Sequence, residues 1–309
     1  MLGRMVEIAE DNRHLSMHRG FLLVNETAAE RRELGRIPLD DITALIASAH
    51  GLSYTHNVLV ALTERGAPFV LCGRNHNVVG VLLSLDGNFE QAKRFDAQIQ
   101  SGQPLRKRLW ATVVKSKTQQ QSAALDALGV GTPAMQLFAS RVRSGDPENI
   151  EAQAARRYWG LLFGENFRRN RDDGSPANSL LNYAYTVLRA CTARAVVAAG
   201  LHPTLSLHHS NASNPLRLVD DLMEPFRPLM DLHVKHLLRA GVDSVTASAK
   251  RELVSALYAD MHTDVGVTPL CVCIQRLATS LALVYTGEAD SLALPLPGLP
   301  LDFQPAFDG

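Results

Sequence analysis

The spacing of apolar residues changes near residue 90, and this change constrains the fold more than any other feature of the chain. Before it, short apolar or alternating runs at 5–9, 20–24 and 42–46 are typical of β-strands. After it, the chain becomes rich in Ala, Leu, Gln and Arg, which are good helix formers. The sequence therefore predicts an α+β protein, in which an N-terminal β-rich domain (residues 1–90) is followed by an all-α domain (residues 91–286).

The first domain is expected to hold one helix among its strands. Residues 55–65 carry Val58, Leu59 and Leu62 at helical spacing, and Gly66 follows as a C-terminal cap. Runs at 69–72 and 78–85 return to strand character. In the second domain we expect helices at 104–128, 133–143, 148–159, 178–199, 216–240, 244–260 and about 267–284. Residues 287–309 hold four prolines and neither Lys nor Arg, and we expect an extended or disordered tail there.

Charge gives no global argument for a nucleic-acid partner, because 31 Lys and Arg balance 31 Asp and Glu. Two local windows are nevertheless basic, one between Asp96 and Asp126 and the other at 156–171. Such windows could neutralise DNA phosphates, although a solvated helix face is the commoner explanation of the pattern. The candidate DNA-binding residues are Arg106, Lys107, Arg108, Lys115, Arg156, Arg157, Arg168 and Arg169.

Several classes of protein are disfavoured by the sequence. No apolar run approaches ~18 residues, so we expect no membrane span. The first ten residues do not resemble a secretory signal. The four cysteines indicate neither a disulfide framework nor paired zinc-binding spacing, and we interpret Cys271 and Cys273 as small buried apolar residues. A cytoplasmic location is the expectation that follows.

Three acidic or imidazole-bearing segments could carry chemistry. Asp221 and Glu224 are three residues apart, so on a helix they share a face, where two like charges repel unless a cation lies between them. Pro225 indicates that this helix kinks or begins there. Of the adjacent His208 and His209, at most one can point into a given site. Glu151, taken alone, is explained better as a first-turn acid favoured by the helix dipole.

Together these groups would form a site rich in oxygen ligands. Carboxylates with one imidazole suit Mg²⁺ or Mn²⁺ better than a structural zinc. A metal held in this way can polarise a phosphodiester and activate a hydroxyl or water for in-line attack. The sequence contains no G-x-x-x-x-G-K-[ST] phosphate loop, which is consistent with chemistry that needs no nucleotide.

Longer motifs resemble one known family. They are EAQAARRYW at 151–159, NSLLNYAYTVL at 178–188, GLHPTLSLHHSN at 200–211, LVDDLMEPFRP at 218–228 and HNVVGVL at 76–82. In their order and spacing they resemble the CRISPR adaptation integrase, the larger universal subunit of the spacer-acquisition complex, and most closely its type II branch, type II-C. Ala152, Ala184 and Ser206 stand where the family has glycine, and Asn77-Val78 departs from its x-Pro pattern.

The resemblance implies a helical catalytic domain with Mg²⁺ or Mn²⁺ held by Glu151, His209 and Glu224, and with Asp221 supporting; His208 matches the ligand position less well. It implies transesterification that joins prespacer 3′-OH ends to the leader–repeat borders. The implied partners are double-stranded DNA (prespacer and CRISPR repeat), a second copy of the chain bound through the N-terminal domain, a small ferredoxin-like subunit and the RNA-guided effector nuclease.

Three alternatives stay open on the residues alone. The same ligands would serve a metal-dependent endonuclease that hydrolyses branched DNA, with water replacing the hydroxyl. A catalytically silent DNA-binding scaffold is the second, although the intact ligand set speaks against it. The third is an unrelated metallohydrolase of small substrates, which the basic windows disfavour only weakly.

Overall fold

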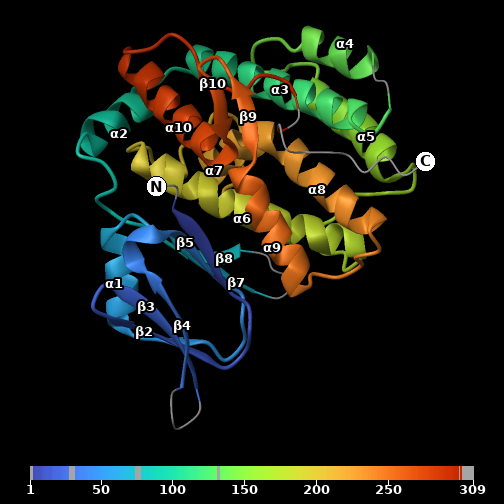
Figure 1. Cartoon of the computed structure of the whole chain (residues 1–309). Helices are drawn as coiled ribbons and strands as arrows, with labels where there is room; N and C mark the ends of the chain where they lie inside the picture. Colours follow the sequence, from blue (N-terminus) through green and yellow to red (C-terminus); the bar gives the residue numbers. More distant parts are fainter. Residues whose placement is uncertain (1–2, 28–31, 74–77, 131–132, 299, 301–309) are drawn as a thin grey trace. The chain divides into compact units, whose positions relative to one another are not determined.

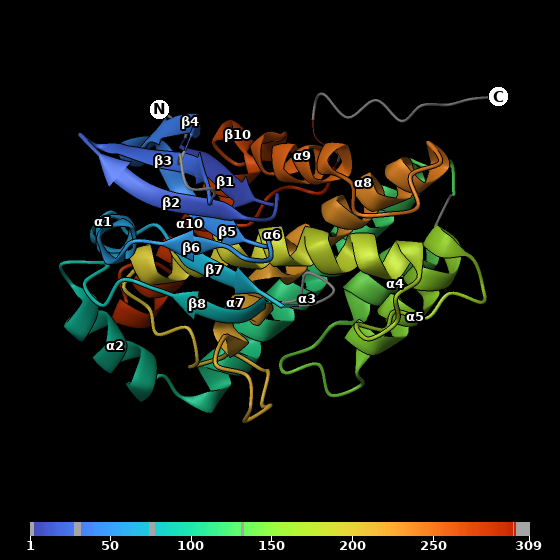
Figure 2. The same cartoon turned by 90° about the horizontal axis from the view of Figure 1, so that it is seen from below.

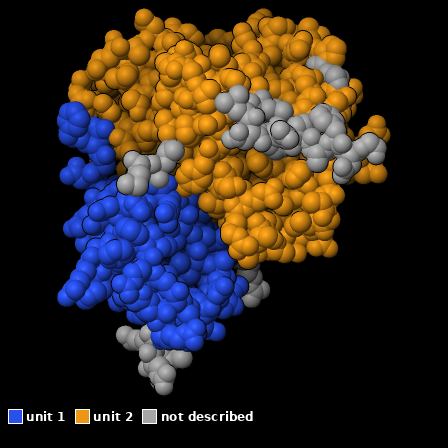
Figure 3. Space-filling view, in the orientation of Figure 1, with its two compact units in different colours: residues 1–89 blue, residues 90–309 orange. Residues whose placement is uncertain are grey.

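The chain forms two compact units, which meet in sequence between Phe89 and Glu90 (Figure 3). The structure, a computed structural model, describes residues 3–27, 32–73, 78–130, 133–298 and 300. Within these residues no helix combines the length and apolar content that crossing a membrane requires. The mixed composition, with strands first and helices after them, confirms the predicted α+β class.

The described residues of the first unit form two four-stranded sheets, one α-helix and the short 3-10 helix η1 (Leu39–Asp41) (Figure 1). One sheet has the order β1-β5-β7-β8, in which β7 and β8 are antiparallel and the other pairs are parallel. The second has the order β4-β3-β2-β6. In chain order the elements are β1 (Arg4–Ile8), β2 (Arg13–His18), β3 (Phe21–Glu26), β4 (Glu33–Pro38), β5 (Ile42–Ala47), β6 (Ser53–Tyr54), α1 (His56–Glu64), β7 (Phe69–Cys72) and β8 (Val78–Leu82).

Both sheets and α1 share one core. Leu15 and Leu22 from the second sheet, Leu45 from the first, and Val58 and Leu62 from α1 are fully buried in one hydrophobic cluster. Since α1 presents apolar side chains three and four residues apart, one of its faces can bury against both sheets at once. This is the helix that the spacing at 55–65 predicts.

Three strands of this unit have no counterpart among the predicted runs: β2, β4 and the two-residue β6. Strand β4 is the edge of its sheet and is mostly exposed, so its residues carry no alternating apolar signal. Strand β2 has one deeply buried residue, Leu15. A two-residue turn at Arg19-Gly20, both with positive φ, joins β2 to β3. The sequence marks this turn but not the strand before it.

The second unit is built around α6, a long helix buried over most of its length (Figures 1 and 2). Helices α7, α8, α9 and α10 all pack against it. The elements in chain order are α2 (Gln91–Gln100), α3 (Gln103–Asp126), α4 (Pro133–Arg141), α5 (Ile150–Phe163), α6 (Pro176–Ala198), α7 (Arg217–Met223), η3 (Glu224–Phe226), α8 (Arg227–Arg239), α9 (Ala247–Ser255), β9 (Asp260–Thr263), β10 (Gly266–Pro269) and α10 (Leu270–Thr286).

This unit is not all-α, which corrects the prediction for 91–286. Strands β9 and β10 form an antiparallel hairpin where helices were expected to end at 260 and to begin at 267. Gly266, with φ +107°, follows the two-residue turn, and Val267 and Thr268 are β-branched. The run is too short for its strand character to stand out between two helices. Helix α2 was not predicted either.

The proline-rich tail is anchored over its first part. Between Gly287 and Gly298 it forms no helix or strand, but Ala293 N–H donates to Ser280 Oγ and Leu296 N–H donates to the His262 carbonyl. Gln120 Nε2 in turn donates to the Leu296 carbonyl. This stretch is therefore extended rather than disordered. Residues 301–309, and the start of the 76–82 motif, lie outside the described residues.

Candidate active site

Glu151 occupies the first turn of α5 because Asp146 holds that turn. The Asp146 carboxylate accepts hydrogen bonds from the backbone N–H groups of Ile150 (2.8 Å) and Glu151 (2.9 Å). These are two of the N–H groups that a helix start leaves without partners. Ile150 is fully buried next to it, which turns Glu151 toward a partly covered position where its side chain is 24% exposed.

Glu151 and Glu224 meet across Lys117, a residue that lies outside all of the sequence motifs. The Nζ atom of Lys117, on α3, lies 2.6 Å from Glu151 Oε1 and 2.6 Å from Glu224 Oε2. Arg227 Nη1 lies 3.0 Å from the other Glu224 oxygen. Two carboxylates and two cations thus form one cluster. Glu224 is almost fully buried in it, and its Oε2 accepts no aligned hydrogen bond from the described residues.

The charges of this cluster hold one another in the ionised form. Burial alone would raise the pKa of Glu224, but Arg227 and Lys117 outweigh it and bring that pKa below its ordinary value. Burial alone would lower the pKa of Lys117, but the two glutamates outweigh it and raise that pKa. A buried ion pair remains charged only when its partners are this close.

His209 belongs to a second cluster, with Asp221. Its Nδ1 lies 2.5 Å from Asp221 Oδ1, and this hydrogen bond raises the pKa of His209 even though burial opposes it. Asp221 is fully buried and also accepts the backbone N–H groups of Leu207, His208 and His209. A carboxylate offers about four lone pairs. Asp221 has used them on the histidine loop, so it supports His209 and has none left for a metal.

The two adjacent histidines diverge, as their adjacency predicts. The His208 ring lies flat on Trp110 of α3, with centroids 4.5 Å apart and an interplanar angle of 2°. His209 meets the edge of the same indole at 5.8 Å. Trp110 is almost fully buried and so provides a fixed wall for the loop. The stack on Trp110 therefore holds the His208 ring in place. Asp221 takes Nδ1 of His209, so Nε2 is the ring nitrogen of His209 that remains for a ligand.

The structure thus brings the predicted site residues together in two pairs. Among the described residues, no three His, Cys, Asp or Glu side chains converge as a metal-binding group. The pairs still interact, because the charge of Glu224 helps to raise the pKa of His209. The spacing of Asp221 and Glu224 suggested one cation between them. In the structure each acid has its own partners instead: Asp221 contacts His209, and Glu224 contacts Lys117 and Arg227. The donors fit a hard divalent cation, since two carboxylates already face one positive charge.

Gln98, on α2, also holds the histidine loop. It is buried, its Nε2 donates to the carbonyls of His202 (3.1 Å) and Leu205 (2.9 Å), and its Oε1 accepts from His202 N–H (2.8 Å). Nothing in the sequence around residue 98 indicated this role. Lys117, in contrast, carried a signal, because it lies three, four and seven residues after Val114, Val113 and Trp110 on the buried face of α3.

The candidate DNA-binding residues are not equivalent. Lys107, Arg108 and Lys115 on α3 are exposed, Arg106 is half-buried, and Arg156, Arg157 and Arg168 are exposed. Arg169 instead points inward, where it donates to the Oδ1 atoms of Asn178 (3.0 Å) and Asn182 (2.7 Å) and lies over the Tyr185 ring. Arg156, Arg157, Arg168 and Arg169 line a cavity of about 570 Å³ together with Trp159 and Phe167.

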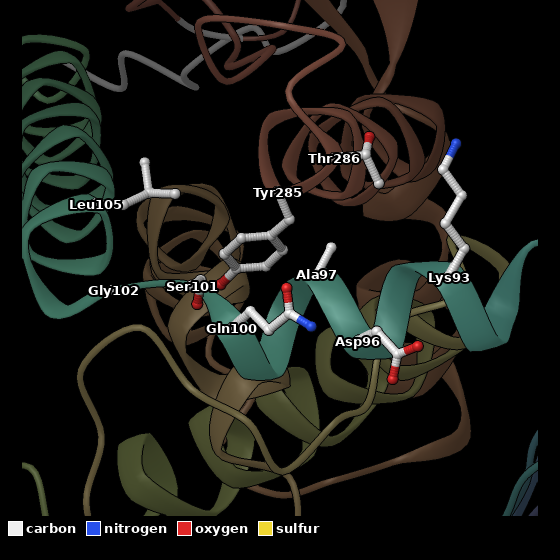
Figure 4. A pocket seen from close by; sticks show the side chains of 9 residues that line it. All are labelled: Lys93, Asp96, Ala97, Gln100, Ser101, Gly102, Leu105, Tyr285 and Thr286. Atoms are coloured by element: carbon white, nitrogen blue, oxygen red, sulfur yellow. The ribbon is translucent and has the colours of Figure 1, made fainter.

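A further cavity, of about 710 Å³, lies between α2 and α10 (Figure 4). Asp96 and Gln100 from α2 line it, with Tyr285 and Thr286 from the end of α10. None of the predicted site residues contributes to its wall. One wall residue, Tyr285, is nevertheless close enough to Asp221 for the charge of that acid to help burial raise the pKa of Tyr285.

A family model and a relative of known name assign the chain to the same family. Residues 6–250 match the family described as CRISPR associated protein Cas1. A CRISPR-associated endonuclease Cas1 from Neisseria meningitidis (serogroup C, strain 8013) is 35% identical over 286 residues, covering 91% of this chain and 92% of that protein.

Two solved structures share the fold. A casposase bound to integration product has a TM-score of 0.79 and 17% identity, over 98% of this chain and 96% of the other. A Cas6-RT-Cas1–Cas2 complex has a TM-score of 0.75 and 19% identity, over 96% of this chain and 36% of the other. At such identities the likeness shows the architecture alone.

Proposed function

The chain belongs to the Cas1 family of CRISPR-associated proteins and is an endonuclease or integrase, and from this premise we propose that it inserts spacers into CRISPR arrays. In this proposal prespacer 3′-OH ends attack the phosphodiesters at the leader–repeat borders, and one phosphodiester is exchanged for another. Mg²⁺ or Mn²⁺ would be the required ion, and Glu151, Glu224 and His209 would hold it.

The observation that carries the proposal is the convergence of Glu151 and Glu224 on one cation. They come from separate helical segments, α5 and η3, yet each places an oxygen 2.6 Å from the same nitrogen. A buried carboxylate and a partly buried one are brought together only where a positive charge offsets their repulsion. Hard oxygen donors of this kind favour Mg²⁺ and Mn²⁺ over a structural zinc.

The surrounding residues position these donors. Asp221 takes the Nδ1 side of His209, which leaves Nε2 to face an ion, the usual arrangement of a metal-binding histidine. Arg227 fixes Glu224, and Asp146 fixes the turn that carries Glu151. When bound, the ion would offset charge on the phosphodiester and lower the pKa of the attacking hydroxyl.

The partners are proposed on the same basis. The exposed cations of α3 and α5 would neutralise phosphates of the prespacer and the repeat. The likeness to a casposase bound to integration product, and to a complex that includes Cas2, supports DNA and a small ferredoxin-like subunit as partners. We also propose a homodimer, contact with the RNA-guided effector nuclease, and a cytoplasmic location.

The test is an integration assay on the full chain with its small partner subunit. A labelled prespacer duplex with free 3′-OH ends is incubated with a plasmid that carries a leader and a repeat, in Mn²⁺ and then in EDTA. Label joined to the plasmid at the repeat borders in Mn²⁺ alone supports the integrase. DNA fragments without joined product would favour the branched-DNA endonuclease, and neither product would favour the silent scaffold.

A further inference from the structure

Lys117 is a buried lysine that bridges two carboxylates. Its side chain is 8% exposed, and its Nζ contacts two acids that come from different segments of the chain. Within the described parts of the chain, it is the one cation in ion-pair contact with Glu151. Glu224 has Arg227 as a second partner, but Arg227 faces the other carboxylate oxygen.

The ammonium therefore neutralises the two facing oxygens by itself. Without it, Glu151 and Glu224 would place two negative charges together in a largely buried space, where the repulsion is weakly screened. The two acids would separate, or one would take up a proton. Lys117 lets both stay ionised and close, which is the arrangement that a divalent cation needs.

An ion and the ammonium cannot use these oxygens together. A Mg²⁺ ion lies about 2.0–2.1 Å from its oxygen ligands. An ion bound to the same two atoms would therefore lie within about 4.7 Å of Nζ, the sum of the two distances, and the two positive charges would repel each other across weakly screened space. A lysine can resolve this conflict, because its long flexible stem allows the charge to move away.

We infer that Lys117 is a resident cation at the metal position, which holds the two ligand glutamates ready and must leave before a divalent ion binds. The inference rests on the proposed function, because it concerns the ion that this function requires. It implies that the apparent metal affinity reflects a competition, in which every binding event includes the release of Lys117. A residue that merely braced the glutamates for the metal would have the opposite effect on affinity.

The test is a measurement of Mn²⁺ affinity on the full chain in the absence of DNA, by the electron paramagnetic resonance signal of free Mn²⁺. The variants are Lys117→Met and Lys117→Gln; the amide of the second can still donate hydrogen bonds to the glutamates if the first folds poorly. Lys115→Met is the matched control, since Lys115 is exposed on the same helix and the substitution removes the same charge.

We expect both Lys117 variants to bind Mn²⁺ about tenfold tighter or more, because a unit charge close to the ion is removed, while Lys115→Met stays near the wild type. The thermal midpoint of Lys117→Met should fall in EDTA and recover in Mn²⁺. Unchanged or weaker binding by the folded Lys117 variants would overturn the inference and leave the proposed function standing. No Mn²⁺ binding by the wild type would overturn both.

Discussion

Nδ1 of His209 lies 2.5 Å from Oδ1 of Asp221, and the same carboxylate accepts three backbone N–H groups of the loop that carries the histidine. The loop and the imidazole are therefore oriented by one buried side chain, which is itself held on α7. The identity of the free imidazole nitrogen follows from this contact. A substitution of Asp221 should therefore impair the metal site although Glu151, His209 and Glu224 are all still present.

Asp221→Asn should weaken Mn²⁺ binding and strand transfer by about 10–100-fold, as is typical when the carboxylate behind a metal-binding histidine is removed. The pKa of His209 should also fall, because the hydrogen bond to Asp221 is the largest cause that raises it. An NMR titration of the His209 ring measures this directly. Asp243→Asn, an exposed carboxylate, is the control. An unchanged His209 pKa would show that Asp221 does not orient the ring.

Gln98→Ala should loosen the histidine loop, because it removes the three hydrogen bonds that join α2 to His202 and Leu205. We expect a decrease of about 1–3 kcal/mol in the free energy of unfolding, the usual effect of leaving buried backbone groups without partners. Hydrogen exchange should become faster at residues 202–209. Gln100→Ala, exposed on the same helix, should change neither quantity. Equal exchange rates in the two variants would contradict the role given to Gln98.

Asp231 should make the protein less stable as the pH rises from about 4 to 7. Burial raises the pKa of its carboxyl to about 7, against the effect of hydrogen bonds from Tyr185 and Tyr158. The folded protein therefore binds this proton more tightly than the unfolded chain does. That stabilisation is complete below the ordinary aspartate pKa and is lost as the pH rises to about 7.

The corresponding decrease in the free energy of unfolding is about 1.4 kcal/mol for each pH unit in that window. Urea unfolding at pH 5 and pH 7.5 should show a smaller decrease for Asp231→Asn than for the wild type, because an amide does not titrate. If the free energy of unfolding changed by the same amount in the wild type and in Asp231→Asn between the two pH values, Asp231 would be ionised throughout this range.

The basic residues of the 156–171 window should separate into two groups. Arg156→Ala and Arg157→Ala should weaken DNA binding and reduce the dependence of log affinity on log salt by about one for each phosphate that is no longer neutralised. Arg169→Ala should instead lower the thermal midpoint, because Arg169 is bonded to Asn178 and Asn182. Filter binding over a range of salt concentrations and a thermal melt measure the two effects. A DNA-binding defect in Arg169→Ala at an unchanged thermal midpoint would contradict this division.

The sequence predicted those features of the fold that depend on residues close together in the chain. The change of period near residue 90, the helix at 55–65 and the break at Pro225 are all properties of neighbouring residues, and the structure has each of them. The β9–β10 hairpin was missed because its strands are four residues each and lie between helices. The exposed edge strand β4 lacks the apolar alternation on which the prediction relied.

The sequence names candidate residues for the site, and their role stays a prediction, but it does not indicate the contacts among them. Glu151, His209 and Glu224 were named from motifs, and Asp221 was given a supporting role. Which atom faces which depends on interactions between distant segments, such as the 34-residue separation of Lys117 and Glu151. The buried position of Lys117 on α3 could have been predicted from its spacing, but its two acidic partners could not.

The most direct test of the proposed site is strand transfer by Glu151→Gln, with Glu148→Gln as the control. Glu148 lies three residues earlier and pairs with Arg141 and Arg143, away from the Lys117 cluster. We predict no joined product from Glu151→Gln at an unchanged thermal midpoint, because Lys117 keeps Glu224 as its partner, and wild-type joining from Glu148→Gln. Joined product from folded Glu151→Gln at the wild-type rate would contradict the proposed site.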